Sequence, residues 1–153
     1  MIKLYTDGAT SNNGKEGAVG GWAYIAVNKE EQIFIHDYGF IPNTTNNICE
    51  LTAAIEGCRA VKALYDQVEV YSDSAYIINC YRDGWYKKWQ YNGWRNSRKE
   101  PVANQDLWEQ LIEYFENPSY TFLKVPAHSG NKYNEIVDKM AVEAKLKGDD
   151  SYR

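Results

Sequence analysis

The sequence has 153 residues, of which 44% are hydrophobic and 14% aromatic, so it can build one substantial core and is too short to suggest two domains. Its net charge of −4 argues against non-specific nucleic-acid binding over the whole surface, and no apolar run approaches the ~20 residues of a membrane-spanning helix. The N-terminus lacks a signal-peptide pattern and the three cysteines form no C-x-x-C pair, so we expect a cytoplasmic protein without disulfides, zinc or a membrane partner.

The first forty residues predict three strands joined by short connections. Residues 2–6, 20–28 and 32–40 are rich in Ile, Val, Tyr, Phe and Trp, which are the residues that favour strands. Because the connections are short, an antiparallel meander is the simplest arrangement.

The rest of the chain predicts helices that alternate with strands. Apolar residues recur at helical spacing from Glu50 to Leu64. The later predicted elements are a strand at 68–71, a short helix at 75–81, a helix at 104–115, a strand at 121–125 and a helix at 133–146 that Gly148 ends. This order predicts an α/β fold with a five-stranded mixed sheet, three antiparallel strands followed by parallel ones, and helices on both faces. We expect a single domain over residues 1–148 and a short polar tail over 149–153.

Four acidic residues occupy positions at which this fold could bring them together. Asp7 and Asp73 each end a predicted strand, and in open α/β sheets the site commonly lies at the carboxyl ends of central strands. Glu50 starts the first predicted helix and Asp138 lies early in the last one. Considered one at a time, these acids have structural explanations. An Asp-Gly pair after a strand usually forms a turn, and an acidic residue in the first turn of a helix usually interacts favourably with the helix dipole.

A cluster of four carboxylates would be held apart by like-charge repulsion unless cations lie among them. Divalent cations make such a cluster tolerable, and a set of ligands made only of oxygen atoms suits Mg²⁺ or Mn²⁺ rather than zinc. The sequence therefore predicts a metal site formed by these acids.

Positive charge is concentrated in one segment of this acidic chain. Residues 81–99 carry a local charge of +5, which leaves −9 for the remainder, and they interleave the cations with Trp and Tyr. Such a surface can lie along a phosphate backbone. The alternative is a helical hairpin whose aromatic residues pack into the core while its cations are merely solvated.

Five groups of short motifs are spread over nearly the whole chain, and both their order and their spacing carry information. They are Thr6-Asp7-Gly8 with Asn13-Gly14, Thr44-Thr45-Asn46-Asn47 with Glu50-Leu51, Ser72-Asp73-Ser74, Pro101-Val102 with Asp106-Leu107-Trp108, and Ala127-His128-Ser129-Gly130 with Asn134-Glu135 and Asp138. In these motifs the chain resembles the type 1 ribonuclease H family. The resemblance implies the ribonuclease H-like fold and metal-dependent cleavage of the RNA strand of RNA/DNA hybrids, leaving 5′-phosphate and 3′-hydroxyl ends.

By this resemblance, the catalytic and metal-binding carboxylates are Asp7, Glu50, Asp73 and Asp138, and Gly8 belongs to the metal site. Two Mg²⁺ ions are expected with substrate, and Mn²⁺ is expected to support activity as well. His128 matches the mobile histidine of the family, whose near-neutral pKa suits proton transfer or product release.

The resemblance also implies contacts to the hybrid. Asn13, Asn46 and Asn47 match positions that contact sugars and base edges across the minor groove, while Thr45 and Asn104 match a pocket for a DNA phosphate. The alternative for Asn46 and Asn47 is helix capping. Two positions depart from the family: Ala75 replaces a longer polar side chain, and Ile48 replaces a frequent arginine.

Residues 81–99 resemble the basic protrusion that some members of the family carry. Lys87, Lys88 and Trp94 are the candidates there for contact with substrate, whereas Trp85 and Trp89 are assigned mainly to packing. Trp108, outside the protrusion, is left open between the two roles. The expected form is a monomeric, free-standing enzyme, because no hybrid-binding domain precedes the first strand.

Two alternatives to this enzyme remain. One is a module that binds hybrids without cutting them, against which the presence of all four acids speaks. The other is a different nuclease of the same fold, such as a resolvase, a transposase or a retroviral-type ribonuclease H fragment. A sugar-phosphate or nucleotide enzyme is disfavoured because the sequence has no Walker-type phosphate loop.

Overall fold

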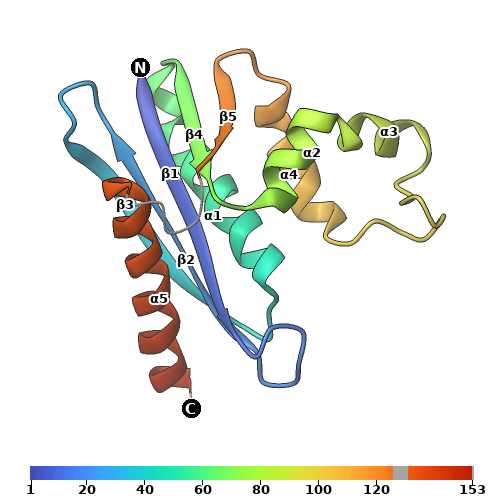
Figure 1. The fold of residues 1–153 in the computed structure, drawn as a ribbon, viewed down its shortest axis with the longest axis horizontal. Helices are drawn as coiled ribbons and strands as arrows, with labels where there is room; N and C mark the ends of the chain where they lie inside the picture. The colour runs from blue at the N-terminus through green and yellow to red at the C-terminus, as the bar shows by residue number, and fades with distance from the viewer. Residues whose placement is uncertain (126–130, 153) are drawn as a thin grey trace.

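The computed structural model describes residues 1–125 and 131–152, with side chains up to residue 150. Its centre is a five-stranded sheet in the order β3-β2-β1-β4-β5 (Figure 1). The strands are β1 (Ile2–Ser11), β2 (Val19–Val27), β3 (Ile33–Pro42), β4 (Val68–Ser72) and β5 (Tyr120–Lys124). β1 pairs antiparallel with β2, and β2 with β3, whereas β4 pairs parallel with both β1 and β5. The predicted mixed sheet is confirmed.

Helices cover both faces of the sheet. They are α1 (Asn46–Val61) with a 3₁₀ turn η1 (Lys62–Leu64), α2 (Ala75–Asp83), α3 (Trp85–Tyr91), α4 (Gln105–Phe115) and α5 (Lys132–Tyr152). In Figure 1, α5 lies along one face while α1 lies behind the other, with α2 and α4 beside it. None of the helices in the described part of the chain is long and apolar enough to cross a membrane.

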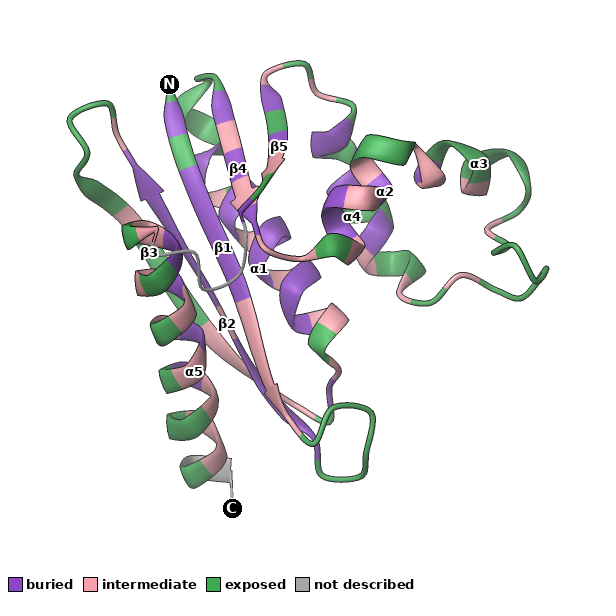
Figure 2. Cartoon of the chain, viewed as in Figure 1, coloured by how far each residue is buried: buried purple, intermediate pink, exposed green. Residues whose placement is uncertain are grey.

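Each face of the sheet has its own core, which the alternation of strand side chains produces. Leu4 on β1 and Leu51 on α1 belong to the larger core, which also receives α2 and α4. Tyr5 and Ile25 point to the opposite face and pack against Val137 of α5. In Figure 2 the buried residues, in purple, make up much of the central strands and recur along the helices that cover them.

The last helix is longer than the sequence predicts. Gly148 does not end it, because α5 continues to Tyr152 and so includes residues 149–152 of the segment expected to be a polar tail. A side chain at Gly148 would collide with the ring of Phe40 on β3. Glycine therefore allows α5 to approach the sheet closely at this position, and the predicted helix end is wrong.

The basic segment forms a protrusion that extends away from the sheet (Figure 1). α3 begins directly after Gly84, whose φ of 71° bends the chain at the end of α2. Trp89 packs against Trp94 and Trp108, with ring centroids 5.7 and 5.4 Å apart. Trp108 is fully buried, so of the two roles left open for it the structure assigns packing.

Candidate metal centre

The parallel pairing of β1 and β4 brings two of the predicted acids together. Tyr5 lies opposite Tyr71 in the register of these strands, and Asp7 and Asp73 follow two residues later on each chain segment. Asp73 lies just beyond the end of β4, as predicted. Asp7 does not end β1, because that strand continues to Ser11 in antiparallel pairing with β2. The two carboxylates nevertheless share the edge at which β4 stops.

Glu50 reaches this edge from α1, which begins earlier than predicted. The Thr45 side chain caps the helix by accepting a hydrogen bond from the N–H of Ile48 at 3.2 Å. The helix therefore starts at Asn46, so Glu50 lies in its second turn. A side chain at Gly8 would lie 2.8 Å from the backbone of Cys49 and Glu50, so glycine permits this close approach of α1 to β1.

The backbone N–H of Gly8 orients two of the carboxylates. It donates to Asp7 Oδ1 at 2.8 Å and to Glu50 Oε1 at 3.2 Å. Asp7, Glu50 and Asp73 each place a carboxylate oxygen within 4.8 Å of the other two. These three residues line a cleft of about 390 Å³, and Asp138 lines it from α5. All four predicted acids thus face one cleft.

The electrostatics of the cleft disfavour four free negative charges. Burial, and next the charge of Asp73, raises the pKa of Asp7 to about 8 from its ordinary value of 3.8. Burial, followed by the charges of Asp7 and Asp73, raises the pKa of Glu50 well above its ordinary range. No Lys or Arg is among the described residues that line the cleft.

The residues of the cleft fit a divalent cation. Glu50 Oε2 is buried and has no hydrogen-bond partner among the described residues, which is costly for a carboxylate unless a cation approaches it. The donors are carboxylate oxygens, which are the ligands that Mg²⁺ and Mn²⁺ prefer. A bound divalent ion would offset both the repulsion and the unpaired oxygen.

The predicted hybrid-contact residues fall into two groups. Asn46 and Asn47 line the cleft, and the N–H of Asn46 donates to Oδ1 of the exposed Asn13 at 2.8 Å. Thr45 and Asn104 do not line it: Thr45 caps α1, and the Asn104 amide lies 3.4 Å from the Tyr76 hydroxyl. The cap of α1 is therefore Thr45 and neither of the asparagines.

Some expected residues lie elsewhere, and the cleft contains residues that were not expected. His128 lies outside the described residues. Ser74 and Tyr76 line the cleft without having been predicted. Ser74 caps α2 through a hydrogen bond from the N–H of Ile77 at 3.3 Å, and a serine directly before a helical run is a signal that could have identified it. Ala75, which stands where the family has a longer polar side chain, also lines the cleft.

A second cavity, of about 540 Å³, lies in the protrusion. It is lined by Trp85, Lys88, Trp89, Asn92, Arg95, Asn96 and Ser97. Trp85, Trp89 and Trp94 pack against the core with part of their surface, as predicted for the first two. Lys87 and Lys88 are both exposed. The protrusion thus combines partly buried aromatic rings with solvent-exposed cations, of which Lys87 lies over the ring of Tyr86 at 5.9 Å.

Known proteins resemble the chain in both sequence and structure. The family model for RNase H matches residues 1–145. A ribonuclease H of Thermoanaerobacter sp. (strain X514) is 45% identical over 143 residues, which cover 94% of this chain and 88% of that protein. The crystal structure of LC9-RNase H1, a type 1 RNase H, superposes with a TM-score of 0.78 at 25% identity, covering 95% of this chain and 72% of that one. LC11-RNase H1, solved in complex with an RNA/DNA hybrid, gives a TM-score of 0.69 at 21% identity over 97% and 99% of the two chains. The chain belongs to the ribonuclease H family.

Proposed function

We propose that this protein is an endonuclease that hydrolyses the RNA strand of RNA/DNA hybrids at the carboxylate cleft. The observation that carries the proposal is the cluster of Asp7, Glu50 and Asp73, whose carboxylate oxygens lie within 4.8 Å of one another. Membership of the ribonuclease H family supports the reaction, and the hybrid bound by the structurally similar LC11-RNase H1 is in keeping with the substrate.

Asp7, Glu50, Asp73 and Asp138 are the residues proposed to hold the metal. Two divalent ions held there, Mg²⁺ or Mn²⁺, would supply activation of the attacking water and stabilisation of the leaving 3′ oxygen, and the products would carry 5′-phosphate and 3′-hydroxyl ends. In this proposal Asp7 and Asp73 would hold both ions and Asp138 would help to hold one of them. Glu50 would favour the other ion and would orient the 2′-hydroxyl or the water.

The protein's own groups prepare the cleft for this role. The Gly8 N–H holds Asp7 and Glu50 in one orientation before any ligand arrives, so little reorganisation is needed on binding. His128 is assigned to proton transfer or product release from its motif alone.

Recognition of the hybrid is assigned to three sets of residues. Asn13, Asn46 and Asn47 are proposed to read sugars and base edges in the wide minor groove beside the cleft. Thr45 and Asn104 are proposed to grip a DNA phosphate. Further along the duplex, the cations of the protrusion would neutralise phosphates while an aromatic ring packs on deoxyribose; the residues proposed for this are Lys87, Lys88 and Trp94.

The remaining parts of the proposal concern the form of the protein. We propose one catalytic domain over residues 1–148, although α5 crosses that boundary, and a monomer as the working form. Cys49, Cys58 and Cys80 are buried free thiols, which is in keeping with the reducing environment of the cytoplasm.

The test is cleavage of an RNA/DNA hybrid labelled on the RNA strand, with Mg²⁺ or EDTA, for the wild type and Asp73→Asn. Single-stranded RNA and duplex DNA serve as parallel substrates. We expect the wild type to cut only the RNA of the hybrid, only with Mg²⁺, and Asp73→Asn to cut nothing. Hybrid binding without cutting by the wild type would favour a silent binding module, and cleavage of branched junctions in place of hybrids would favour another nuclease of this fold.

A further inference from the structure

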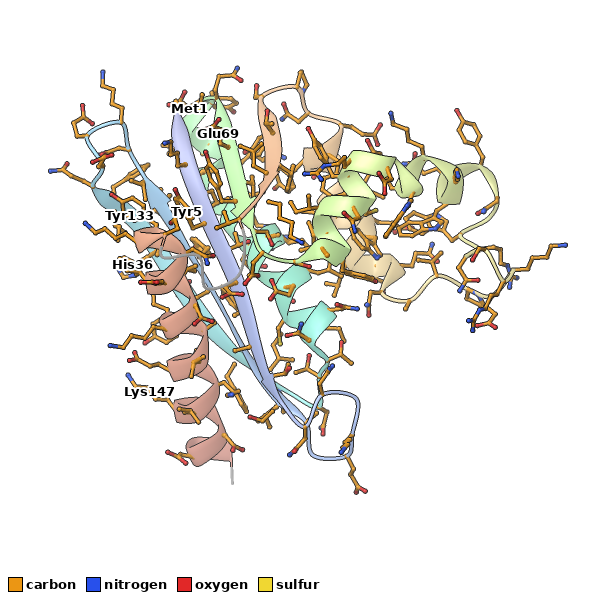
Figure 3. All side chains as sticks on the ribbon, viewed as in Figure 1. Met1, Tyr5, His36, Glu69, Tyr133 and Lys147 are labelled. Atoms are coloured by element: carbon orange, nitrogen blue, oxygen red, sulfur yellow. The ribbon has the colours of Figure 1, made fainter. Side chains whose placement is uncertain are left out.

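Three tyrosine rings, here called the stack, pack in a row on the face of the sheet that α5 covers; one pair is stacked and the other is tilted by 37°. Tyr5 of β1 and Tyr71 of β4 are register partners, and their rings stack with centroids 4.8 Å apart and planes 13° from parallel. The ring of Tyr133, in the first turn of α5, lies 5.3 Å from that of Tyr5. Figure 3 shows Tyr133 at the start of α5 beside Tyr5 on the sheet. Tyr5 is therefore the central ring of the stack.

The three elements joined by this stack are those that carry three of the cleft acids. Asp7 follows Tyr5 by two residues, and Asp73 follows Tyr71 by two. Because strand side chains alternate, Tyr5 and Asp7 point to the same face of β1. Asp138 lies five residues after Tyr133 on α5 and lines the same cleft as Asp7. The stack thus lies directly behind the cleft.

Hydrogen bonds hold the two outer rings of the stack and the start of α5. Asn131, just before α5, accepts through its Oδ1 from the backbone N–H of Tyr133 at 3.1 Å and of Asn134 at 3.0 Å, in the first turn of the helix. The Tyr133 hydroxyl donates to the carbonyl of Glu31, between β2 and β3, at 2.9 Å.

Tyr71 is held in the same way on its own strand. Its hydroxyl donates to Glu69 Oε1 at 3.0 Å. With only 4% of its surface exposed, Tyr5 is enclosed between β4 and α5. A shift of β4 or α5 relative to β1 would separate the rings, and a shift of α5 would also draw the Tyr133 hydroxyl away from the Glu31 carbonyl.

This arrangement matters because a metal site tolerates little displacement of its ligands. Mg²⁺ demands near-ideal octahedral geometry, and the acids of the cleft repel one another. We propose that Tyr5 is a positioning residue that fixes the spacing of the acids on β1, β4 and α5. The role presupposes metal binding by the cleft and therefore rests on the proposed function.

The test compares Tyr5→Leu with Tyr5→Phe. The leucine variant loses the stack and the hydroxyl, whereas the phenylalanine variant loses only the hydroxyl. We expect Tyr5→Leu to weaken Mg²⁺ binding about tenfold, as removal of groups that orient metal ligands does, and Tyr5→Phe to retain most of the affinity. Isothermal titration calorimetry with Mg²⁺ alone gives the affinity, and the Mg²⁺ concentration for half-maximal cleavage gives a second measure.

A matched control separates positioning from general packing. Tyr114, also 4% exposed, packs its ring 5.1 Å from that of Tyr120 at the start of β5. We expect Tyr114→Leu to lower the melting temperature and leave Mg²⁺ affinity unchanged. If Tyr5→Leu does not fold, Tyr71→Leu, at a half-buried position, takes its place with the same expectation.

The outcomes distinguish this inference from the proposed function. If the wild type binds Mg²⁺ and Tyr5→Leu binds it with the same affinity, the positioning role of Tyr5 is overturned and the proposed function stays intact. A wild type that neither binds Mg²⁺ nor cuts the hybrid would overturn the proposed function, and the inference with it.

Discussion

The carboxylate cleft and the basic protrusion hold their polar side chains in opposite ways. In the cleft, Asp7 and Glu50 are buried and share the backbone N–H of one glycine, and the central strands of the sheet support them. In the protrusion, Lys87 and Lys88 extend from a short helix into solvent, and only the aromatic rings beneath them are packed. The cleft therefore holds its carboxylates in defined positions, whereas the protrusion mainly supplies positive charge.

This difference matches the separate requirements of hydrolysis at the cleft and of binding to the hybrid by the protrusion. Metal-assisted hydrolysis depends on ligand positions, since small misplacements of reacting groups are costly. Attraction between cations and a phosphate backbone acts over a longer range and tolerates mobile side chains. We therefore expect substitutions in the cleft to change the rate of cleavage and those in the protrusion to change affinity.

Removal of the buried acid of α1 should have the largest effect. Glu50→Gln keeps the size of the side chain but removes its charge, so cleavage at saturating Mg²⁺ should fall by more than the roughly 10- to 100-fold that loss of an outer-shell partner costs. Binding of the hybrid should persist. Steady-state cleavage and a fluorescence-anisotropy titration measure the two quantities, and a fall in affinity equal to the fall in rate would contradict the separation of roles.

Closing the gap between β1 and α1 should affect both stability and activity. Gly8→Ala would place a methyl group 2.8 Å from the backbone of Cys49 and Glu50, and such overpacking costs about 1 to 3 kcal/mol. At Gly57 the nearest atoms are side-chain atoms of Leu4 and Tyr24, at 3.1 Å. Gly57→Ala should therefore be milder in chemical denaturation and should keep activity. Equal behaviour of the two variants would count against Gly8 as the residue that sets this approach.

When a chelator removes metal ions, the charge of the cleft should reduce stability as the pH rises. Between pH 3.8 and about 8, folded Asp7 keeps a proton that the unfolded chain releases, so the folded state loses stability as the pH rises through this range. In EDTA at pH 8, we expect Asp7→Asn to be more stable than the wild type by roughly 2 kcal/mol, or about 4 to 8 °C in Tm.

This gain should shrink as the pH falls toward 4, because the unfolded chain then begins to protonate Asp7 as well, near its ordinary pKa of 3.8. Mg²⁺ should raise the Tm of the wild type and not that of Asp7→Asn. The exposed residue Glu109 supplies the control variant Glu109→Gln. A gain in Tm that did not depend on pH would mean that charge in the cleft is not its cause.

Charge reversal in the protrusion should have the smallest effect on the rate of cleavage. Lys87→Glu with Lys88→Glu should weaken hybrid binding several-fold and lower the slope of log affinity against log salt by about two. The same reversal at the exposed residues Lys3 and Lys29 is the control. Unchanged affinity and salt dependence would exclude the protrusion as a binding surface.

The order of elements and the location of the cleft could be predicted from the sequence. Strand and helix periodicities differ, and the predicted carboxyl ends of the first and fourth strands indicated Asp7 and Asp73, although β1 itself continues past Asp7. Periodicity also placed Glu50 on the first helix. The helix begins earlier than predicted, because it opens with two asparagines and Thr45, not an apolar pattern, marks its start.

Errors arose where one residue type has two structural uses. Gly148 was expected to stop a helix, but it lies inside α5 because Phe40 packs against it. Asp7-Gly8 was expected to end a strand, but β1 continues because β2 supplies antiparallel partners.

The role of Trp108 could not be decided from the sequence. Its burial depends on Tyr76, whose hydroxyl accepts a hydrogen bond from the indole N–H at 3.0 Å. Such long-range partners leave no local pattern in the sequence.

The most direct test of the division between cleft and protrusion is single-turnover cleavage of a hybrid, measured over a series of enzyme concentrations. The plateau rate reports the cleft and the half-saturating concentration reports binding. We expect Lys87→Glu with Lys88→Glu to reach the wild-type plateau at higher enzyme concentration, and Glu50→Gln to bind with wild-type half-saturation and a greatly reduced plateau. A protrusion variant whose plateau falls as far as that of Glu50→Gln would contradict the account.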